Sequence, residues 1–476
     1  METQSIKGRD SLTGKKGLVI GAGRSGSGSA SLLLACGAEA VLYDGNTGLE
    51  QEKLKQDVRN LLLHECSFNA EDADSVLSAL YIILGDLDTE IAKKADFAVL
   101  SPGVPTDSPL VEQLKKEGLP IWSEVELAYR VGRGKVIAIT GTNGKTTTTA
   151  LAGKIMEDAC PSVFIVGNIG TAYTSKALET VDESWTVAEI SSFQLETIDT
   201  FAPKASAILN ITPDHLDRHH TMEEYIRVKE LITKNQGTDD ICVLNYEDPI
   251  LRAFGENAVP RIIWFSGERE LKEGFFLRGD EIILREGGQE SLIVRTSQVK
   301  LLGRHNYENI MAAIALTYGV GVPMKSIIKS VCEFQAVAHR IEFVLEKNQV
   351  AYYNDSKGTN PDAAIKGIQA MNRPTLLIGG GYDKHSDYED WIHAFDGKVK
   401  KLVLIGQTKE KIKETAERCG FHDIILCEDL KEAVEICAKL AEPGDAVLLS
   451  PACASWGQFA NYEQRGDMFK DMVRAL

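Results

Sequence analysis

Short apolar runs bounded by glycine recur along the whole chain and predict buried β-strands. The runs rich in Val, Ile and Leu are residues 17–21, 136–141, 186–190, 205–211, 375–380, 402–406 and 446–450. Helix-length segments of mixed polar and apolar residues separate many of them. Continuous rather than alternating hydrophobicity is typical of parallel strands that helices cover on both faces. The pattern therefore predicts an α/β protein.

The chain is long enough for several domains. It has 476 residues, and at about 150 residues per domain this length favours three. We predict domains at residues 1–125, 126–336 and 337–476, with polar hairpins around residues 267–288 inserted into the second. The charged stretch within residues 47–95 predicts no particular structure.

A glycine-rich turn follows the first predicted strand. Gly21, Gly23 and Gly26 form a G-x-G-x-x-G pattern, and a second predicted strand ends at Asp44. This pattern is typical of a domain that binds a dinucleotide such as NAD: the glycines let a backbone approach the diphosphate at a helix amino terminus, and the acid suits a ribose hydroxyl. The same turn also fits a different diphosphate nucleotide, or simple packing of a strand against a helix. The motif alone leaves these three interpretations open.

The second predicted domain opens with a phosphate loop. Residues 141–146 read Gly-Thr-Asn-Gly-Lys-Thr after an apolar strand and before a helical segment. Glycines there expose backbone N–H groups to phosphates, Lys145 reaches the terminal phosphates, and Thr146 offers a hydroxyl to Mg²⁺. Ile139 stands where the full motif has its first glycine. An ordinary glycine turn is the alternative, but the strand–loop–helix context favours ATP.

Three further side chains in this domain suit metal or acid–base chemistry. Glu189 ends an apolar strand, and a buried carboxylate is costly unless a cation such as Mg²⁺ pairs with it. His215 follows another strand, and Lys229 lies beside the apolar stripe of a helix. Each also has an ordinary explanation: a solvent-facing acid, a capping or surface histidine, and a lysine that extends to water.

The third predicted domain carries three polar clusters, each directly after a predicted strand. They are residues 354–362, 379–384 and 450–456. Lys357 lies just before a helix that begins with Pro361, and the helix amino terminus adds positive potential to that of the lysine. Each cluster could be a plain loop. Because ligands bind at the carboxyl ends of parallel strands, three such loops in one domain favour a binding site.

Composition narrows the classes of partner. Lys and Arg number 52 against 69 Asp and Glu, a net charge of -17, which argues against non-specific binding of nucleic acid or anionic membranes. The amino terminus lacks the apolar segment of a signal peptide, and no run is long enough to span a bilayer, so we expect a cytoplasmic protein. The nine cysteines contain no C-x-x-C pair and are typical of reduced thiols.

The order of these motifs resembles that of the Mur ligase family of ATP-dependent amide ligases. The resemblance is carried by GTNGKTT (141–147), GNIG (167–170), EISSFQLE (189–196), NITPDHLDRH (210–219), HNYEN (305–309), AHRIE (338–342), NDSKGTN (354–360) and SPACASWGQFANYEQRG (450–466). The last block is similar to that of the member that adds D-glutamate. Tyr462 stands where that member usually has Phe, and GGYDKHSDY at 380–388 replaces a common DKG.

The resemblance implies a fold and residue roles. It implies a Rossmann-like first domain that binds the UDP end of an acceptor, a central P-loop ATPase-like domain, and a Rossmann-like third domain that binds the amino acid. The implied nucleotide-binding residues are Gly141, Thr142, Asn143, Gly144, Lys145, Thr146, Thr147, Asn306, Asn309, Arg340 and Asp355. The implied acceptor residues are Arg24, Ser25, Gly26, Asp44, Ser101, Gly103, Asn168 and Ser191, and those around D-glutamate are Lys357, Thr359, Lys384, Ser455 and Tyr462.

The same resemblance implies the reaction. The chain is expected to use ATP to join D-glutamate to UDP-N-acetylmuramoyl-L-alanine in peptidoglycan synthesis, acting as a monomer. Catalysis would depend on Lys145, Glu189, His215 and Lys229, with two Mg²⁺ sites held by Thr146, Glu189, His215 and a carbamylated Lys229. The alternatives are another amino-acid ligase of the family, a folylpolyglutamate synthase, an NAD-dependent dehydrogenase, or a nucleotide-binding regulator without catalysis.

Overall fold

The computed structural model describes residues 8–168, 170–335, 337–384 and 386–476. Sequence predictions that fall on the first seven residues, on Ile169 of the GNIG motif, on Ala336 at a predicted domain end and on His385 lie outside the described residues. The chain forms two compact units. The first runs to Ile293 and includes Glu308–Ser330, and the second comprises Val294–Tyr307 and Val331–Leu476. The domain boundaries expected from the sequence stay a prediction.

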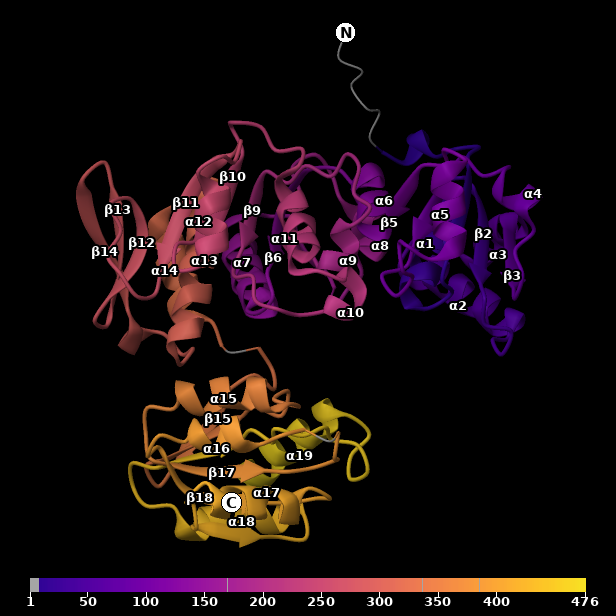
Figure 1. Ribbon diagram of the computed structural model, residues 1–476. Helices are drawn as coiled ribbons and strands as arrows, with labels where there is room; N and C mark the ends of the chain where they lie inside the picture. Colours follow the sequence, from indigo (N-terminus) through magenta and orange to yellow (C-terminus); the bar gives the residue numbers. More distant parts are fainter. Residues whose placement is uncertain (1–7, 169, 336, 385) are drawn as a thin grey trace. The chain divides into compact units, whose positions relative to one another are not determined.

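The first unit begins with a parallel sheet of five strands in the order β3-β2-β1-β4-β5. Its strands are β1 (Lys16–Ile20), β2 (Glu39–Asp44), β3 (Leu80–Leu84), β4 (Phe97–Leu100) and β5 (Ile121–Ser123). Its helices are η1 (Arg9–Ser11), α1 (Arg24–Ala35), α2 (Gln51–His64), α3 (Ala70–Val76), η2 (Leu77–Ala79), α4 (Thr89–Ala92), α5 (Pro109–Lys116) and α6 (Glu124–Val131). Figure 1 shows these elements in indigo and purple.

The stretch of residues 47–95, for which the sequence predicts no particular structure, is mostly ordered secondary structure. Helix α2 buries Leu54, Val58 and Leu62, which recur every four residues and form one apolar stripe. The Asn69 side chain accepts a hydrogen bond from the backbone N–H of Asp72 and so caps α3. The sequence did not predict α2 because the many charged residues in this stretch outnumber the three residues of its apolar stripe.

A second sheet of nine strands follows, in the order β14-β13-β12-β11-β10-β9-β6-β8-β7. Its strands are β6 (Lys135–Thr140), β7 (Val163–Gly167), β8 (Trp185–Glu189), β9 (Ala205–Ile208), β10 (Ile241–Asn245), β11 (Arg261–Ser266), β12 (Gly274–Arg278), β13 (Glu281–Glu286) and β14 (Gln289–Arg295). Strands β12 and β13 pair antiparallel, so the polar hairpin predicted around residues 267–288 is confirmed. Figure 1 shows β12, β13 and β14 at one edge of this sheet.

Helices of several lengths accompany the second sheet. They are α7 (Lys145–Ala159), α8 (Tyr173–Lys176), η3 (Ala177–Glu179), α9 (Ser192–Leu195), α10 (Leu216–His219), α11 (Met222–Glu230), η4 (Leu231–Thr233), α12 (Pro249–Gly255), η5 (Thr296–Gln298), α13 (Arg304–Gly319) and α14 (Met324–Glu333). One hydrophobic cluster contains Leu32 of α1, Tyr129 of α6 and Ala188 of β8. The first two sheets therefore share a core, which explains why they belong to one compact unit.

The second unit contains a sheet of six strands in the order β15-β16-β20-β17-β18-β19. Its strands are β15 (Glu342–Lys347), β16 (Val350–Asn354), β17 (Thr375–Gly379), β18 (Val399–Leu404), β19 (Ile424–Leu426) and β20 (Ala446–Leu449). Its helices are α15 (Pro361–Ala370), α16 (Glu389–His393), α17 (Lys409–Arg418), α18 (Leu430–Leu440) and α19 (Tyr462–Ala475). Consecutive residues of the central strands belong to two different apolar clusters, one on each face of the sheet. Leu448 and Leu449 of β20 are an example. This sheet is therefore covered on both faces, and the predicted α/β class is confirmed.

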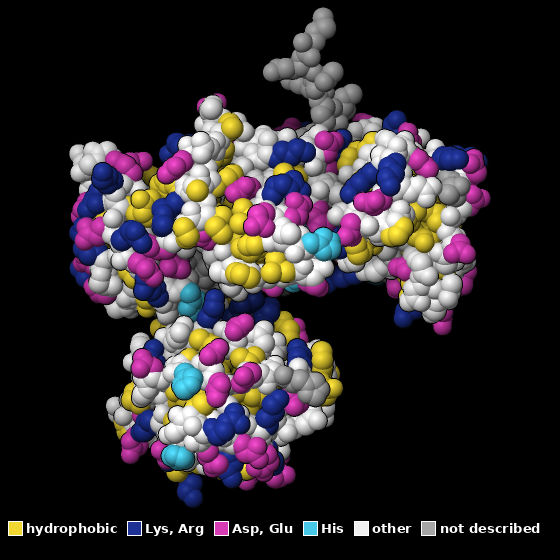
Figure 2. Space-filling model, viewed as in Figure 1, with side chains coloured by type: hydrophobic (Ala, Val, Ile, Leu, Met, Phe, Trp, Pro, Cys, Tyr) yellow, Lys and Arg dark blue, Asp and Glu magenta, His cyan; other side chains and the backbone are white. Residues whose placement is uncertain are grey.

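Neither a concentrated acidic surface in the view of Figure 2 nor a membrane-spanning helix is found among the described residues. Acidic and basic side chains are interspersed over the face shown in Figure 2, so the excess of negative charge forms no single acidic field there. No helix in the described part of the chain combines the length and the apolar character needed to cross a membrane.

Candidate active site

The loop between β6 and α7 has the backbone that a phosphate-binding turn requires. Gly141 and Gly144 have φ angles of +147° and +86°, which side chains rarely tolerate. A Cβ atom on Gly144 would lie 2.3 Å from Oδ1 of Asn309, so that approach also needs glycine. Thr146 and Thr147 occupy the first turn of α7, whose free N–H groups attract anions.

Lys145 folds back over the loop that it follows. Its Nζ donates to the carbonyl oxygens of Gly141 and Thr142, both at 2.9 Å. The ammonium is thus held against the turn between β6 and α7, and its contact with phosphates stays a prediction.

A polar segment after β9 braces the same loop. Asn210 accepts from the N–H of Asn143 at 2.8 Å and donates to the Asn143 carbonyl at 3.1 Å. The Thr142 hydroxyl contacts the Thr212 carbonyl and the Tyr225 hydroxyl, both at 3.1 Å. Sequence reasoning assigned no role to Asn210, although its place at the end of a strand next to β6 was a usable signal.

Glu189 ends β8, the strand that pairs with β6 on the other side. Its side chain is 2% exposed, and Asn168 Nδ2 donates to its Oε1 at 3.3 Å. The structure thus brings Glu189 and Asn168 together next to the strand that carries the phosphate loop. A buried carboxylate contacted by an amide retains acceptor capacity for a cation.

Lys229 projects from α11 into the same region. Its Nζ donates to the Gly141 carbonyl at 3.0 Å and lies 4.6 Å from the centre of the Tyr225 ring. Burial, and then repulsion by the Lys145 ammonium, lower the pKa of Lys229 to about 7. Lys145 and Lys229 therefore share one carbonyl. Of the two interpretations open for a lysine beside an apolar stripe, a side chain that extends to water and a buried amine, the structure shows the buried amine.

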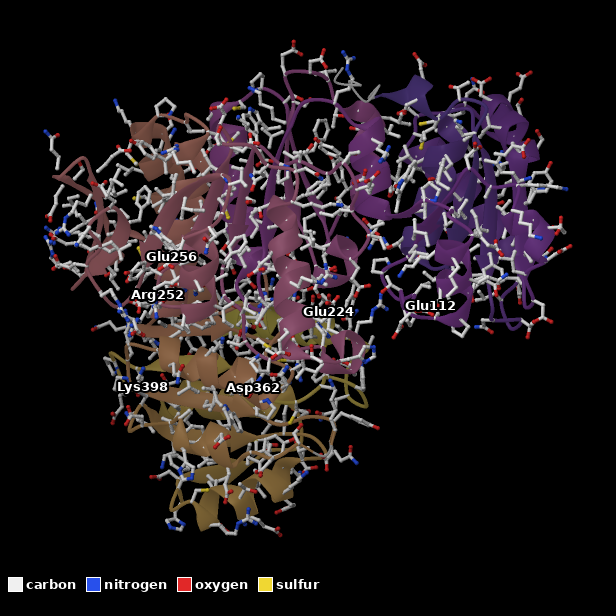
Figure 3. All side chains as sticks on the ribbon, turned by 45° about the horizontal axis from the view of Figure 1, so that its top comes forward. Glu112, Glu224, Arg252, Glu256, Asp362 and Lys398 are labelled. Atoms are coloured by element: carbon white, nitrogen blue, oxygen red, sulfur yellow. The ribbon has the colours of Figure 1, made fainter. Side chains whose placement is uncertain are left out.

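The opposite face of α11 is ordinary surface. Glu224, labelled in Figure 3, pairs with Arg227 one turn along the helix. The charged side chains on this face are exposed and paired with each other, whereas Lys229 on the other face is buried.

His215 and Ser191 border this region. His215 directly precedes α10 and has a left-handed conformation, with φ of +52°. Its half-exposed ring meets Phe193 edge to face at 5.0 Å. Ser191 caps α9 through a reciprocal pair of hydrogen bonds with Gln194. Gln194 also donates to the buried carboxyl group of Glu124 at 2.7 Å. This hydrogen bond joins α9 to α6.

The described residues contain no group of three His, Cys, Asp or Glu side chains that could hold a metal ion by themselves. Thr146 lies in the first turn of α7 and Glu189 at the end of the neighbouring strand β8, and both are oxygen donors. These two donors fit Mg²⁺, which usually keeps several waters and takes one or two protein oxygen ligands together with substrate phosphates.

The glycine turn of the first sheet is tightly braced. A Cβ atom on Gly26 would lie 1.8 Å from the Gly21 carbonyl oxygen. Asp44 accepts from the Ala22 N–H at 2.8 Å, and the Ser101 hydroxyl donates to Gly21 at 2.9 Å. The acid that the dinucleotide fingerprint assigned to a ribose is thus engaged by the loop backbone.

A cavity of about 590 Å³ lies beside this turn. It is lined by Ala22, Gly23, Arg24, Ser27, Leu49, Glu50, Lys53, Leu54, Asp57, Asn60, Leu61, His64 and Glu65. Arg24 also donates to the Gly170 carbonyl at 3.0 Å, next to α8 of the second sheet. Ser25 lies in the first turn of α1, and Gly103 lies in the turn after β4.

The two asparagines of α13 have different surroundings. Asn309 packs against Gly144 and accepts from the Thr148 hydroxyl at 3.4 Å. Asn306 donates to the Leu302 carbonyl at 2.7 Å, one turn before it. The structure thus brings Asn309 to the phosphate loop.

In the second unit, the three predicted loops follow the adjacent strands β16, β20 and β17. They carry Asp355, Lys357, Thr359, Lys384 and Ser455, and Tyr462 begins α19, which follows the third loop. Arg465, which no sequence pattern singled out, is fully buried among them and donates to the Ser356 hydroxyl and carbonyl and to the Cys453 carbonyl. Its position in a mixed polar helix gave no sign of this role.

Asp355 is buried beside these loops. Its Oδ2 accepts from the Ser450 hydroxyl at 2.7 Å, and its Oδ1 accepts from the Ile341 N–H at 3.3 Å. Burial raises the pKa of Asp355 from 3.8 to about 7, although these hydrogen bonds oppose the shift. Arg340 lies close enough to favour the charged form, and its own Nε is buried without a hydrogen bond in the described structure.

We expect Asp355→Asn to remove part of the pH dependence of stability. Between about pH 4 and pH 7 the folded Asp355 keeps a proton that the unfolded chain releases, so stability falls as pH rises, by at most about 1.4 kcal/mol per pH unit. Urea unfolding at several pH values across this window measures the slope. The exposed Asp362, labelled in Figure 3, provides the matched control Asp362→Asn. Equal slopes in all three proteins would show that Asp355 is ionised when folded.

Comparison with known proteins agrees with the motif order. Residues 139–317 match the Mur ligase middle domain, and residues 339–453 match the domain described as Mur ligase, glutamate ligase domain. A UDP-N-acetylmuramoylalanine--D-glutamate ligase of Lachnoclostridium phytofermentans is 52% identical over 97% of this chain and 98% of its own length. One from Lachnospira eligens is 50% identical over 98% of this chain and 100% of its own.

Solved structures share the fold at low identity. UDP-N-acetylmuramate-alanine ligase from Thermotoga maritima has a TM-score of 0.56 at 18% identity and covers 97% of this chain and 99% of its own. UDP-N-acetylmuramoylalanyl-D-glutamyl-2,6-diaminopimelate--D-alanyl-D-alanyl ligase from Acinetobacter baumannii has a TM-score of 0.55 at 16% identity over 86% of this chain and 88% of its own.

Proposed function

The chain belongs to the Mur ligase family, and from this premise we propose that it uses ATP to join D-glutamate to UDP-N-acetylmuramoyl-L-alanine, with release of ADP and phosphate. The observation that carries the proposal is that Lys145 and Lys229 both donate to the Gly141 carbonyl of the phosphate loop, while Glu189 ends the strand that pairs with β6 beside it. Full-length relatives named as D-glutamate ligases support this choice of amino acid.

The reaction needs an activated carboxyl group. A carboxylate is a poor electrophile, so the L-alanine carboxylate attacks the γ-phosphate of ATP and becomes an acyl phosphate. The amine of D-glutamate then attacks the acyl carbon and expels phosphate. Two anions meet in the first step, and Lys145 together with the N–H groups of the loop offsets their repulsion and stabilises the transferring phosphoryl group.

Mur ligases use Mg²⁺ with ATP, and Thr146, Glu189 and His215 are the groups that would hold it here. When bound, Mg²⁺ neutralises charge on the phosphates. We propose two Mg²⁺ sites. We also infer that Lys229 reacts with CO₂ to form a carbamate. An amine whose pKa is about 7 is about half unprotonated at neutral pH, and this neutral form can attack CO₂. Relative to the ammonium form, the carbamate changes the charge of Lys229 by about two units, in the direction that a cation needs.

The remaining assignments divide between the two units. Arg24, Ser25, Gly26, Asp44, Ser101 and Gly103 would hold the UDP end of the acceptor, next to the cavity, and Asn168 and Ser191 its peptide end. In the second unit, Lys357, Thr359, Lys384, Ser455 and Tyr462 would surround D-glutamate, and Arg340, Asp355 and Asn306 would contact the nucleotide. Action as a monomer stays a prediction.

The decisive experiment is a panel of amino acids in a phosphate-release assay. Purified protein with ATP, Mg²⁺ and UDP-N-acetylmuramoyl-L-alanine should release phosphate with D-glutamate and not with L-glutamate, L-lysine or D-alanine. Release with a different amino acid would make the chain another ligase of the family. Hydride transfer to NAD without ATP consumption would restore the dehydrogenase interpretation of the glycine turn.

A further inference from the structure

Two aromatic side chains lie exposed at the carboxyl end of the third sheet. Tyr382 is 40% and Trp456 55% exposed, and their ring centres are 5.6 Å apart in an edge-to-face arrangement. Tyr382 follows β17 and Trp456 follows the adjacent β20. The Tyr382 N–H donates to the Ala454 carbonyl at 2.9 Å, so the two loops are joined by backbone pairing. The two rings thus form a fixed aromatic surface between adjacent loops, and such a surface can contact a cation or a ligand.

The Trp456 ring contacts a lysine ammonium. Lys384 Nζ lies 4.9 Å from the centre of the Trp456 ring. The neighbouring carboxylate of Asp383 points instead to Lys411 on α17, at 3.2 Å. An aromatic face attracts an ammonium without neutralising it. The charge of Lys384 therefore stays available to an anion.

A second contact of the same kind lies nearby in the fold. Lys357, after β16, has its Nζ 5.3 Å from the centre of the Tyr462 ring, and β16 is the other neighbour of β20. Both lysines thus lie over rings that belong to the segment after β20. Two ammonium groups held on separate loops suit a ligand with two carboxylates.

We propose that Trp456, supported by Tyr382, is a positioning residue that orients the Lys384 ammonium for a carboxylate of the amino-acid substrate. The inference rests on the proposed function, because it assigns the patch to that substrate. A free lysine loses much side-chain entropy when it binds an anion. The indole restricts the lysine beforehand, so less of this cost falls on substrate binding.

The test is the Michaelis constant of each substrate in Trp456 variants. Trp456→Leu removes the aromatic face and should raise KM for D-glutamate about threefold to tenfold, while Trp456→Phe keeps a ring and should raise it less. KM for ATP and for the acceptor, and the melting temperature, should stay unchanged because Trp456 is mostly solvent-exposed.

The first unit offers a matched control. Tyr81 is 51% exposed, and Lys16 Nζ lies 5.3 Å from the centre of its ring, so Tyr81→Leu breaks a similar contact in the other unit. It should leave every KM unchanged. If Trp456 acts only through Lys384, Trp456→Leu should have no further effect in a Lys384→Ala background.

The outcomes separate this inference from the proposed function. Wild-type protein without D-glutamate-dependent phosphate release overturns the function, and the inference with it. An active protein in which Trp456→Leu leaves KM for D-glutamate unchanged overturns the inference alone. Additive effects of Trp456→Leu and Lys384→Ala, or equal changes in all three KM values, likewise contradict a positioning role.

Discussion

Lys145→Ala is expected to lower ATP-dependent phosphate release about a thousandfold or more. Lys145 is held against the phosphate loop by two carbonyl oxygens, where its charge would meet the transferring phosphoryl group. Loss of a positioned cation at that group typically lowers the rate by about two to five orders of magnitude. Single-turnover phosphate release with saturating acceptor and D-glutamate measures the effect.

A control on the same helix separates this role from general charge. Lys154 lies on α7, pairs with Asp158 and is partly exposed, so Lys154→Ala removes the same charge from the surface and should retain nearly full activity. The Lys145→Ala protein should still bind the UDP-linked acceptor in calorimetry. Wild-type turnover in Lys145→Ala would show that residues 141–146 do not hold the reacting nucleotide.

Lys229→Ala is expected to be nearly inactive and to recover part of its activity when a short-chain carboxylic acid is added. The variant loses the carbamate that we propose, and it leaves a space beside Gly141 that acetate or propionate can enter. A carboxylate in that space would restore the lost oxygen ligand and negative charge. Phosphate release should therefore rise with acid concentration and saturate.

Two variants test the specificity of this rescue. Arg227→Ala, on the exposed face of the same helix, should stay active and should not respond to the acid. Lys145→Ala should stay inactive at every acid concentration, because a carboxylate does not replace a cation. Full activity of Lys229→Ala without acid would exclude the carbamate as a functional group.

The strands and the phosphate loop were predictable because their signals are local. Continuous apolar runs specify strands buried on both faces, and the strand–loop–helix context of residues 141–146 compensated for Ile139 in place of glycine. The Gly144 backbone angle, at φ +86°, is likewise a property that glycine alone makes inexpensive. Helix α2 was missed because its apolar stripe is narrow among many charges.

Burial and pairing depended on contacts between distant segments. Lys229 reads as a surface lysine in its own helix, and only the packing of α11 against the loop after β6 makes it a buried amine. The burial of Arg465 also depends on contacts outside its own helix. One of its hydrogen-bond partners, Ser356, lies more than a hundred residues away along the chain, and another is Cys453. Desolvation and distant carbonyls decide the protonation of such groups, and neither is encoded in local sequence.

By itself, the sequence determined the α/β class, the nucleotide loop and the polar clusters at strand ends, because hydrophobic periodicity and glycine placement act over a few residues. The tertiary structure alone decided that Lys145 and Lys229 share the Gly141 carbonyl, that Asp44 braces its own glycine turn, and that Trp456 lies beneath Lys384. Those relations arise from the order of strands in each sheet, which brings loops that are far apart along the chain to one edge.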